Sequence, residues 1–449
     1  MFGKLWQTLF GGAASDSASR NRIPPSAVIS EPEDPPTFLV REPLLDALQR
    51  VAGYRFAIRR PAGHWDDTSE RFFDRALVDH LLAQNIARLT GNRPFLISLR
   101  AESLRLEQLD RLAASHPILQ LAAPEEASHD WPAALLARAR TQIDLGARLA
   151  CSPDQLTSPL ADYRTASDMI VIAADRLAPP DLLATVRQLR QSHPGTPLLA
   201  AGVDSIELFD ACRQMHFDFY QGGYLTARRE GGDEKLSSQR IVVSQLIGHL
   251  RRKDTDYDRL VSIARQDIAL TFRLLRYINS AAMGLRTKIG SLKQAMVYIG
   301  REGLYRWLTL LLFSSGKSAP GDEALRETSL GRARMCELLA QRRMSQAACE
   351  QAFVTGLLSL VDVLFRQPME KALDQLDLPT EIHEALARQE GPYGPLLALT
   401  LACEQGDTEK VERLAAPFGL DREQANALYL NAQAWALEYD LGLDRETEA

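Results

Sequence analysis

Eight short apolar runs alternate with helical patterns between residues 38 and 225, and this alternation constrains the fold more than any other feature. Each run has the length of a buried strand, and amphipathic segments lie between most of them. The runs are Phe38–Val40, Tyr54–Ile58, Pro94–Leu99, Ile118–Ala122, Ala147–Cys151, Met169–Ile172, Pro197–Ala201 and Phe217–Tyr220. Strands that alternate with helices form parallel sheets with crossover helices. We therefore predict a (β/α)8-type barrel, with a doubly wound sheet as the alternative.

The hydrophobic period changes to 3.6 residues after residue 241, which predicts an all-α second half. Apolar side chains at helical spacing form one stripe over residues 260–278. Asp267 is placed to cap a helix within this stripe, and Ser291 followed by Gln294 makes a capping-box pattern. No run in this half has the pattern of a strand.

The composition excludes several classes of protein. Lys and Arg number 52 and Asp and Glu number 58, so the net charge is −6. Nucleic-acid-binding domains are usually strongly basic, so we expect no nucleic-acid partner. No apolar run reaches about 18 residues, so we expect no membrane span. The five cysteines are widely spaced without a CxxC pair, which predicts reduced thiols in a cytoplasmic protein.

The first ten residues carry an apolar stripe at helical spacing. It consists of Phe2, Leu5, Trp6, Leu9 and Phe10. Such a stripe fits either an anchor for a partner or membrane surface, or a short helix that packs on its own domain. Membrane binding usually needs several cationic side chains, so the second interpretation is favoured. The residues that follow are rich in Gly, Ala, Ser and Pro and indicate a flexible linker.

Two motifs in the second half resemble the HDOD family. Residues 267–281 read D-x-x-L-x-x-x-L-L-x-x-x-N-S-A, and residues 289–300 resemble I-x-S-x-x-x-A-x-x-x-L-G. The motif residues are Asp267, Asn279, Ser280, Ser291 and Gly300. We interpret them as structural, because Asn and Ser at helix ends commonly bind backbone groups. The related HD hydrolases need a His-Asp pair, and Ser359-Leu360 stands where that pair would lie.

Three segments of the first half resemble an EAL domain. Arg41–Leu44 resembles the opening strand, Gly53–Arg59 resembles G-Y-E-A-L-L-R, and Gln221–Leu225 resembles the closing Q-G-Y motif. The resemblance implies a chain made of a degenerate EAL barrel followed by an HDOD domain. The implied division is a short helix and linker at 1–35, the barrel at 36–228, the HDOD domain at 236–430 and a tail at 431–449.

The EAL resemblance also implies a chemistry that these residues do not match. Active members hydrolyse cyclic di-GMP with two divalent ions, and such ions need several carboxylate ligands. The functional positions of the family fall on Arg55, Ser98, Ala123, Cys151, Ser152, Val171 and Ala201. Glu125 or Glu126 could take the fourth-strand place with Asp154 close by, but one or two carboxylates do not make a binuclear site. We expect no metal, no cofactor and no hydrolysis.

The resemblance therefore implies a non-catalytic signalling scaffold in a bacterial pathway related to cyclic di-GMP, acting through protein–protein interaction. The alternative is a receptor that binds cyclic di-GMP without cutting it. Arg59 matches the arginine that contacts ligand phosphate in the family, and Gln221 is retained at its position. The sequence leaves the protein partner and the oligomeric state open.

Overall fold

A computed structural model describes residues 37–59, 67–122, 131–163, 168–227, 238–252, 255–279, 283, 285, 288–313, 321–376 and 378–447. The N-terminal stripe, Ala123, Ser280 and the polar stretch 228–237 lie outside these residues. The chain divides into two compact units. The first contains residues 236–315 with 375–377, and the second contains residues 36–235, 316–374 and 378–449.

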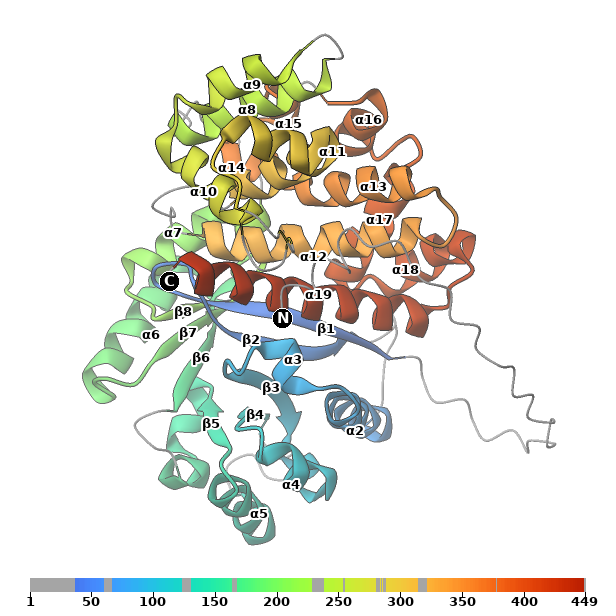
Figure 1. Ribbon diagram of the computed structural model, residues 1–449. Helices are drawn as coiled ribbons and strands as arrows, with labels where there is room; N and C mark the ends of the chain where they lie inside the picture. Colours follow the sequence, from blue (N-terminus) through green and yellow to red (C-terminus); the bar gives the residue numbers. More distant parts are fainter. Residues whose placement is uncertain are drawn as a thin grey trace, which may run out of the picture. The chain divides into compact units, whose positions relative to one another are not determined.

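The second unit contains a closed barrel of eight strands in chain order (Figure 1). Every strand overlaps one of the eight apolar runs, so the predicted barrel is confirmed and the doubly wound alternative is wrong. The strands are β1 (Phe38–Asp46), β2 (Val51–Arg59), β3 (Phe95–Arg100), β4 (Ile118–Ala122), β5 (Arg148–Cys151), β6 (Met169–Ala173), β7 (Leu198–Ala201) and β8 (Phe219–Tyr220).

The direction of β1 differs from the expectation of a parallel sheet. β1 pairs antiparallel with β2, where Glu42 lies opposite Arg55, and antiparallel with β8. The remaining neighbours, from β2 to β8, are parallel. Only the short segment 47–50 joins β1 to β2. A parallel crossover needs about a dozen residues or more, so a connection this short can only form a hairpin.

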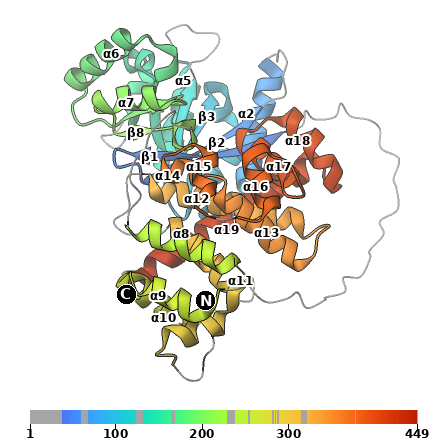
Figure 2. The same cartoon turned by 90° about the horizontal axis from the view of Figure 1, so that it is seen from above.

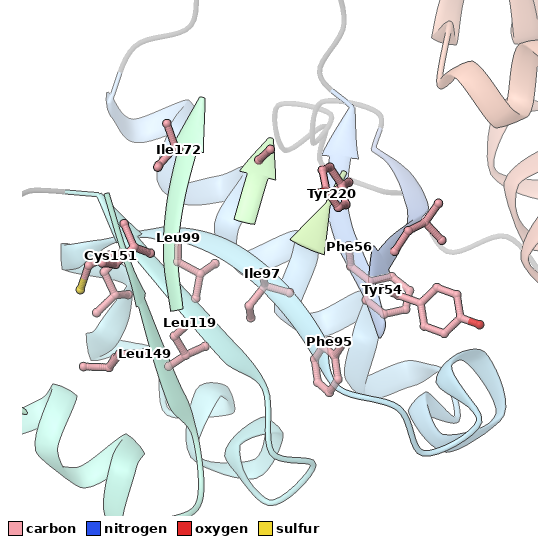
Figure 3. Close-up of a cluster of buried hydrophobic side chains, with 14 of the residues drawn as sticks. Tyr54, Phe56, Phe95, Ile97, Leu99, Leu119, Leu149, Cys151, Ile172 and Tyr220 are labelled. Atoms are coloured by element: carbon pink, nitrogen blue, oxygen red, sulfur yellow. The ribbon is translucent and has the colours of Figure 1, made fainter. Parts of the chain in front are cut away.

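Two apolar clusters follow from the alternation of side chains along each strand. One set of strand residues packs against the surrounding helices and includes Phe56, Ile97 and Leu119 (Figure 3). The alternate set, which includes Leu96 and Leu199, forms a smaller cluster made of strand residues alone, inside the barrel. The helices between the strands are α2 (Asp67–Ala83), α3 (Ile86–Thr90), α4 (Gln108–Ala113), α5 (Ala133–Asp144), α6 (Pro179–Ser192) and α7 (Ile206–Gln214).

Helices from the second half of the chain complete the barrel unit. They are α12 (Asp322–Ala340), α13 (Gln346–Leu358), α14 (Val361–Phe365), α15 (Met369–Asp374), α16 (Thr380–Arg388), α17 (Gly394–Gln405), α18 (Thr408–Ala415) and α19 (Arg422–Thr447). α19 contacts β1 and α3, and Figure 1 shows it along β1. Figure 2 shows α16, α17 and α18 close together. The Asn426 side chain binds both the backbone nitrogen and the backbone oxygen of Leu39, at 2.9 and 2.8 Å. The segment expected as a tail from residue 431 continues this helix, with Trp435 and Leu437 buried.

The first unit contains α8 (Ser238–Arg251), α9 (Tyr257–Ala264), α10 (Ile268–Ile278) and α11 (Leu292–Phe313). Asp267 caps α10 by accepting a hydrogen bond from the Leu270 backbone nitrogen at 3.0 Å. Asn279 ends α10, and its side chain binds the carbonyl of Leu275 and both backbone groups of Ile289. This one amide therefore joins the end of α10 to the segment that precedes α11.

Two further HDOD motif residues lie along α11. The Ser291 hydroxyl precedes the helix and accepts from the Gln294 backbone nitrogen at 3.5 Å. Gly300 interrupts the helix with a φ of 74°, a value that glycine adopts without a steric penalty. The described residues from 238 onward contain no strand, so the predicted all-α half is confirmed. None of the helices in the described part of the chain is long and apolar enough to cross a membrane.

Candidate functional site

A cavity of about 1390 Å³ opens at the end of the barrel where the parallel strands finish. Its lining includes Arg55 on β2, Ser98 on β3, Gln120 on β4 and Gln221 directly after β8. Residues of α12, α17 and α19 also line it, so the helical part of the second unit forms one wall. Ligands of (β/α)8 barrels bind at this carboxyl end of the strands. The cavity is therefore the candidate site.

The cavity brings together most of the positions that the EAL resemblance singled out. Those that line it are Arg55, Ser98, Ser152, Val171 and Ala201, together with Arg59 and Gln221. Cys151 does not line it, because neighbouring strand residues point to opposite faces. Its thiol lies with Leu149 in the cluster between the strands and the helices (Figure 3).

Three of these side chains converge on one carboxylate that the sequence did not single out. Arg59 Nη2 lies 2.9 Å from Glu42 Oε1, and Arg55 Nη1 lies 3.4 Å from Glu42 Oε2. Gln221 Nε2 donates to the same Oε2 at 2.6 Å. The strand register explains the meeting, since Glu42 and Arg55 are cross-strand partners. The Arg41-Glu42-Pro43-Leu44 motif could have pointed to Glu42, but only the register shows what it meets.

These ion pairs are accessible to solvent. The side chains of Arg55 and Arg59 are 31% and 44% exposed, and that of Glu42 is 20% exposed. Exposed ion pairs contribute only about 0–1 kcal/mol to stability. The cluster of Glu42, Arg55, Arg59 and Gln221, which we call the Glu42 cluster, is therefore of little consequence for folding and can exchange partners.

The described cavity residues that the EAL resemblance matches to functional positions do not fit a pair of divalent ions. The resemblance aligns Arg55 with the motif glutamate, and its positive charge would oppose a cation. The Ser98 hydroxyl donates to Gln120 Oε1 at 2.9 Å, and Val171 and Ala201 have no ligand atom. Within the described ranges, no group of three or more His, Cys, Asp or Glu side chains is placed to hold a metal ion.

The position of the HD pair is equally unsuited to a metal. The Ser359 hydroxyl donates to the Gly356 carbonyl at 2.7 Å and accepts from Arg332 Nη1 at 3.2 Å. Arg332 forms two 2.7 Å hydrogen bonds with the carboxylate of Glu404. Burial opposes the charged form of Arg332, but Glu404 outweighs it and the pKa of this guanidinium is raised. A fixed cation, the guanidinium of Arg332, therefore lies beside Ser359.

A buried polar network joins β1 to α12 and α19, and its residues Arg41, Glu327 and Gln433 also line the cavity. Arg41 Nη2 lies 2.7 Å from Glu327 Oε1 and 2.7 Å from Gln433 Oε1. The Tyr54 hydroxyl donates to the same Glu327 carboxylate at 2.9 Å, and the Arg41 guanidinium covers the Tyr54 ring at 4.4 Å. Burial, with Glu327 as the second cause, raises the pKa of Tyr54. Adjacent residues of β1 thus have different partners: Arg41 pairs with α12 and α19, while Glu42 pairs with β2 and Gln221, and both line the cavity.

Comparison with protein families identifies an HDOD domain at residues 236–385. The match begins in the first compact unit and extends into the second, as far as α16. The HDOD resemblance of the sequence is therefore confirmed.

Two relatives match different shares of the chain. "Cyclic di-GMP phosphodiesterase CdgJ" of Vibrio cholerae is 32% identical to this chain. The matched region covers 53% of this chain and 55% of the Vibrio protein. "Uncharacterized protein YuxH" of Bacillus subtilis is 25% identical over 89% of this chain and 97% of its own length. The chain therefore matches about half of the first relative and nearly all of the second.

A solved EAL domain protein from Listeria monocytogenes EGD-e aligns with 42% of this chain and 86% of its own chain. The TM-score is 0.33 and the identity is 17%. A TM-score this low establishes no shared function, and the barrel assignment rests on the strand pairing given above.

Proposed function

We propose that this chain is a non-catalytic regulatory protein of a cyclic di-GMP-related pathway that acts through protein–protein contacts. The likeness to a Vibrio cholerae protein named a cyclic di-GMP phosphodiesterase supports the pathway. Because that relative is named a phosphodiesterase, hydrolysis of cyclic di-GMP is the competing function that an experiment must exclude.

One observation carries the loss of hydrolysis. The residues that the resemblance matches to the family's functional positions and that line the cavity are Arg55, Ser98, Ser152, Val171 and Ala201, and none of them is a carboxylate. A two-metal phosphodiesterase needs several carboxylates close together, both to hold the ions and to activate water. Arg55 reverses the required charge at the central position, and its guanidinium is already paired with Glu42.

A manganese titration tests this point directly. Free Mn²⁺ is measured by electron paramagnetic resonance during addition to the purified full chain, with and without cyclic di-GMP. We expect no pair of ions bound at micromolar concentration. Two such ions per chain would overturn the proposal, and Glu125→Gln and Glu126→Gln would then show whether residues 123–130 supply the ligands.

The candidate cavity favours a second function, a receptor that binds cyclic di-GMP without cutting it. Arg55 and Arg59 offer two guanidinium groups at the mouth of a cavity large enough for a small ligand. Guanidinium groups form strong charge-assisted hydrogen bonds with phosphate. For either function we propose that the protein is located in the cytoplasm. The five cysteines are buried free thiols, as is common in a reducing compartment.

Calorimetric titration separates the two candidates. Micromolar binding of cyclic di-GMP that is lost in Arg59→Ala would favour the receptor. No heat and no rise in melting temperature would favour the scaffold, because a ligand that binds only the folded state must stabilise it. Arg50→Ala is the matched control, since Arg50 pairs with Asp46 on β1 and does not line the cavity.

A further inference from the structure

We propose that Glu42 is an internal anion that closes a metal-independent phosphate site formed by Arg55, Arg59 and Gln221. The identity of the natural ligand, cyclic di-GMP, rests on the proposed receptor function. The existence of the phosphate site does not depend on that function. This site adds a means of regulation that neither candidate function contains.

The hydrogen bonds of the Glu42 cluster have the arrangement of an occupied anion site. Arg59 binds one carboxylate oxygen of Glu42, while Arg55 and Gln221 bind the other. The donors come from β2 and from the end of β8, and the carboxylate comes from β1, which lies between these strands. Arginine binds carboxylate and phosphate with the same paired geometry. The Glu42 carboxylate therefore takes the place that a phosphate oxygen pair would take.

The charge balance of the cluster favours an external anion. Two guanidinium groups face one carboxylate, so the cluster itself carries a net charge of +1. The rest of the cavity lining contains three arginines and six carboxylates, so the positive charge is local to the cluster. Its ion pairs are partly exposed, and the contact of Arg55 with Glu42 is long at 3.4 Å. A phosphodiester can therefore approach through the cavity and compete with Glu42 for the same donors.

The neighbouring residue, Arg41, also lines the cavity but has a buried partner. Arg41 is 3% exposed, and it pairs with Glu327, which is 5% exposed. Breaking a buried pair is far more costly than breaking an exposed one. Release of Glu42 can therefore proceed while β1 stays attached to α12 and α19.

The presence of Arg55 also predicts how phosphate binding at this site depends on metal ions. A phosphate bound through magnesium is lost when a chelator removes the metal. A phosphate bound by Arg55 and Arg59 needs no metal, because these guanidinium groups carry the neutralising charge themselves. Binding at this site should therefore be unchanged by EDTA.

The test compares the wild-type chain with Glu42→Gln, which keeps the shape of the side chain and removes its charge. Inorganic pyrophosphate and cyclic di-GMP are titrated in EDTA by calorimetry. We expect Glu42→Gln to bind pyrophosphate at least 10-fold more tightly, which equals about 1.4 kcal/mol. The gain should disappear when Arg59→Ala is added. Asp46→Asn is the matched control, because it removes a charge from β1 outside the cavity.

Each outcome decides the proposal. Equal affinity of wild type and Glu42→Gln for both probes, an equal gain in Asp46→Asn, or no pyrophosphate binding by Glu42→Gln would each overturn it. Tighter pyrophosphate binding without binding of cyclic di-GMP would support the closed anion site and count against the receptor candidate. Glu42→Ala is the second variant, and it is measured in the same way if Glu42→Gln does not fold.

Discussion

The buried pair of Arg41 and Glu327 should determine how firmly β1 is attached to α12. The side chains are 3% and 5% exposed, and their charged atoms lie 2.7 Å apart. Glu327 also accepts the hydroxyl of Tyr54 and lies 3.7 Å from Arg93 Nη1, so its removal takes a shared partner from three groups. The informative perturbation is Glu327→Ala.

The expected loss follows from the uncompensated charge. Removing one partner of a buried ion pair costs about 3–5 kcal/mol. Arg41 would keep its bonds to the Leu89 carbonyl and to Gln433. These remaining acceptors place the expected loss in the free energy of unfolding near the lower end, at about 3 kcal/mol. Replacing both partners, as in Arg41→Met with Glu327→Leu, should recover at least half of that loss, because no isolated charge remains.

Urea unfolding followed by circular dichroism measures these losses. Asp144→Ala is the control, because Asp144 pairs with Arg140 on the surface, where the side chains are 60% and 59% exposed. Its effect should stay below about 0.5 kcal/mol. A loss below about 1 kcal/mol for Glu327→Ala, or a double variant as unstable as the single one, would refute the reasoning.

Three further predictions concern other parts of the chain. Asn279→Ala removes three hydrogen bonds and should lower the unfolding free energy of the first unit by about 2 kcal/mol in a urea titration; an unchanged midpoint would contradict this. Burial raises the pKa of Cys336 to about 12. Its thiol should not react with iodoacetamide at pH 8 until the protein unfolds, and rapid labelling of the native chain would contradict its burial. Because the unfolded thiol ionises near pH 9 while the folded thiol stays protonated, its contribution to stability should be lost as the pH rises from about 9 toward 12. Gly222 has a φ of 151°, and a Cβ there would lie 2.2 Å from the Val203 carbonyl oxygen, so Gly222→Ala should cost at least about 2 kcal/mol in thermal unfolding. Gly223→Ala is its control, since the nearest atom would be 3.4 Å away, and equal melting of the two variants would contradict the steric argument.

The barrel was predictable because each strand overlaps a separate apolar run and helical segments lie between most of these runs. The direction of β1 was not, since a run of apolar residues has no direction in the sequence. The four residues between β1 and β2 contained the needed information, because a connection of that length permits only a hairpin.

The site was predictable only in part. The resemblance placed Arg59 and Gln221 at the barrel mouth, where the cavity does contain them. It did not place Glu42 between them, because residues 42, 59 and 221 meet only through strand register and barrel closure. The same limit applies to Cys151 and Ser152, since which of two neighbours faces the cavity depends on the pleat of β5.

The continuation of α19 past residue 431 was also missed from the sequence. Its buried face includes Ala432, Ala434 and Ala436 among larger residues such as Trp435. Alanine is common on both exposed and buried helix faces, so it gives a weak hydrophobic signal. Packing against β1 and α3, which are distant in sequence, is what buries this segment.

The central claim is that the barrel does not hydrolyse cyclic di-GMP, and a chromatographic assay of the reaction tests it most directly. The full chain is incubated with cyclic di-GMP in Mg²⁺ and, separately, in Mn²⁺, and linear dinucleotide is measured over time. We predict no product above the protein-free control. Product that forms with metal and is abolished by EDTA would contradict the account.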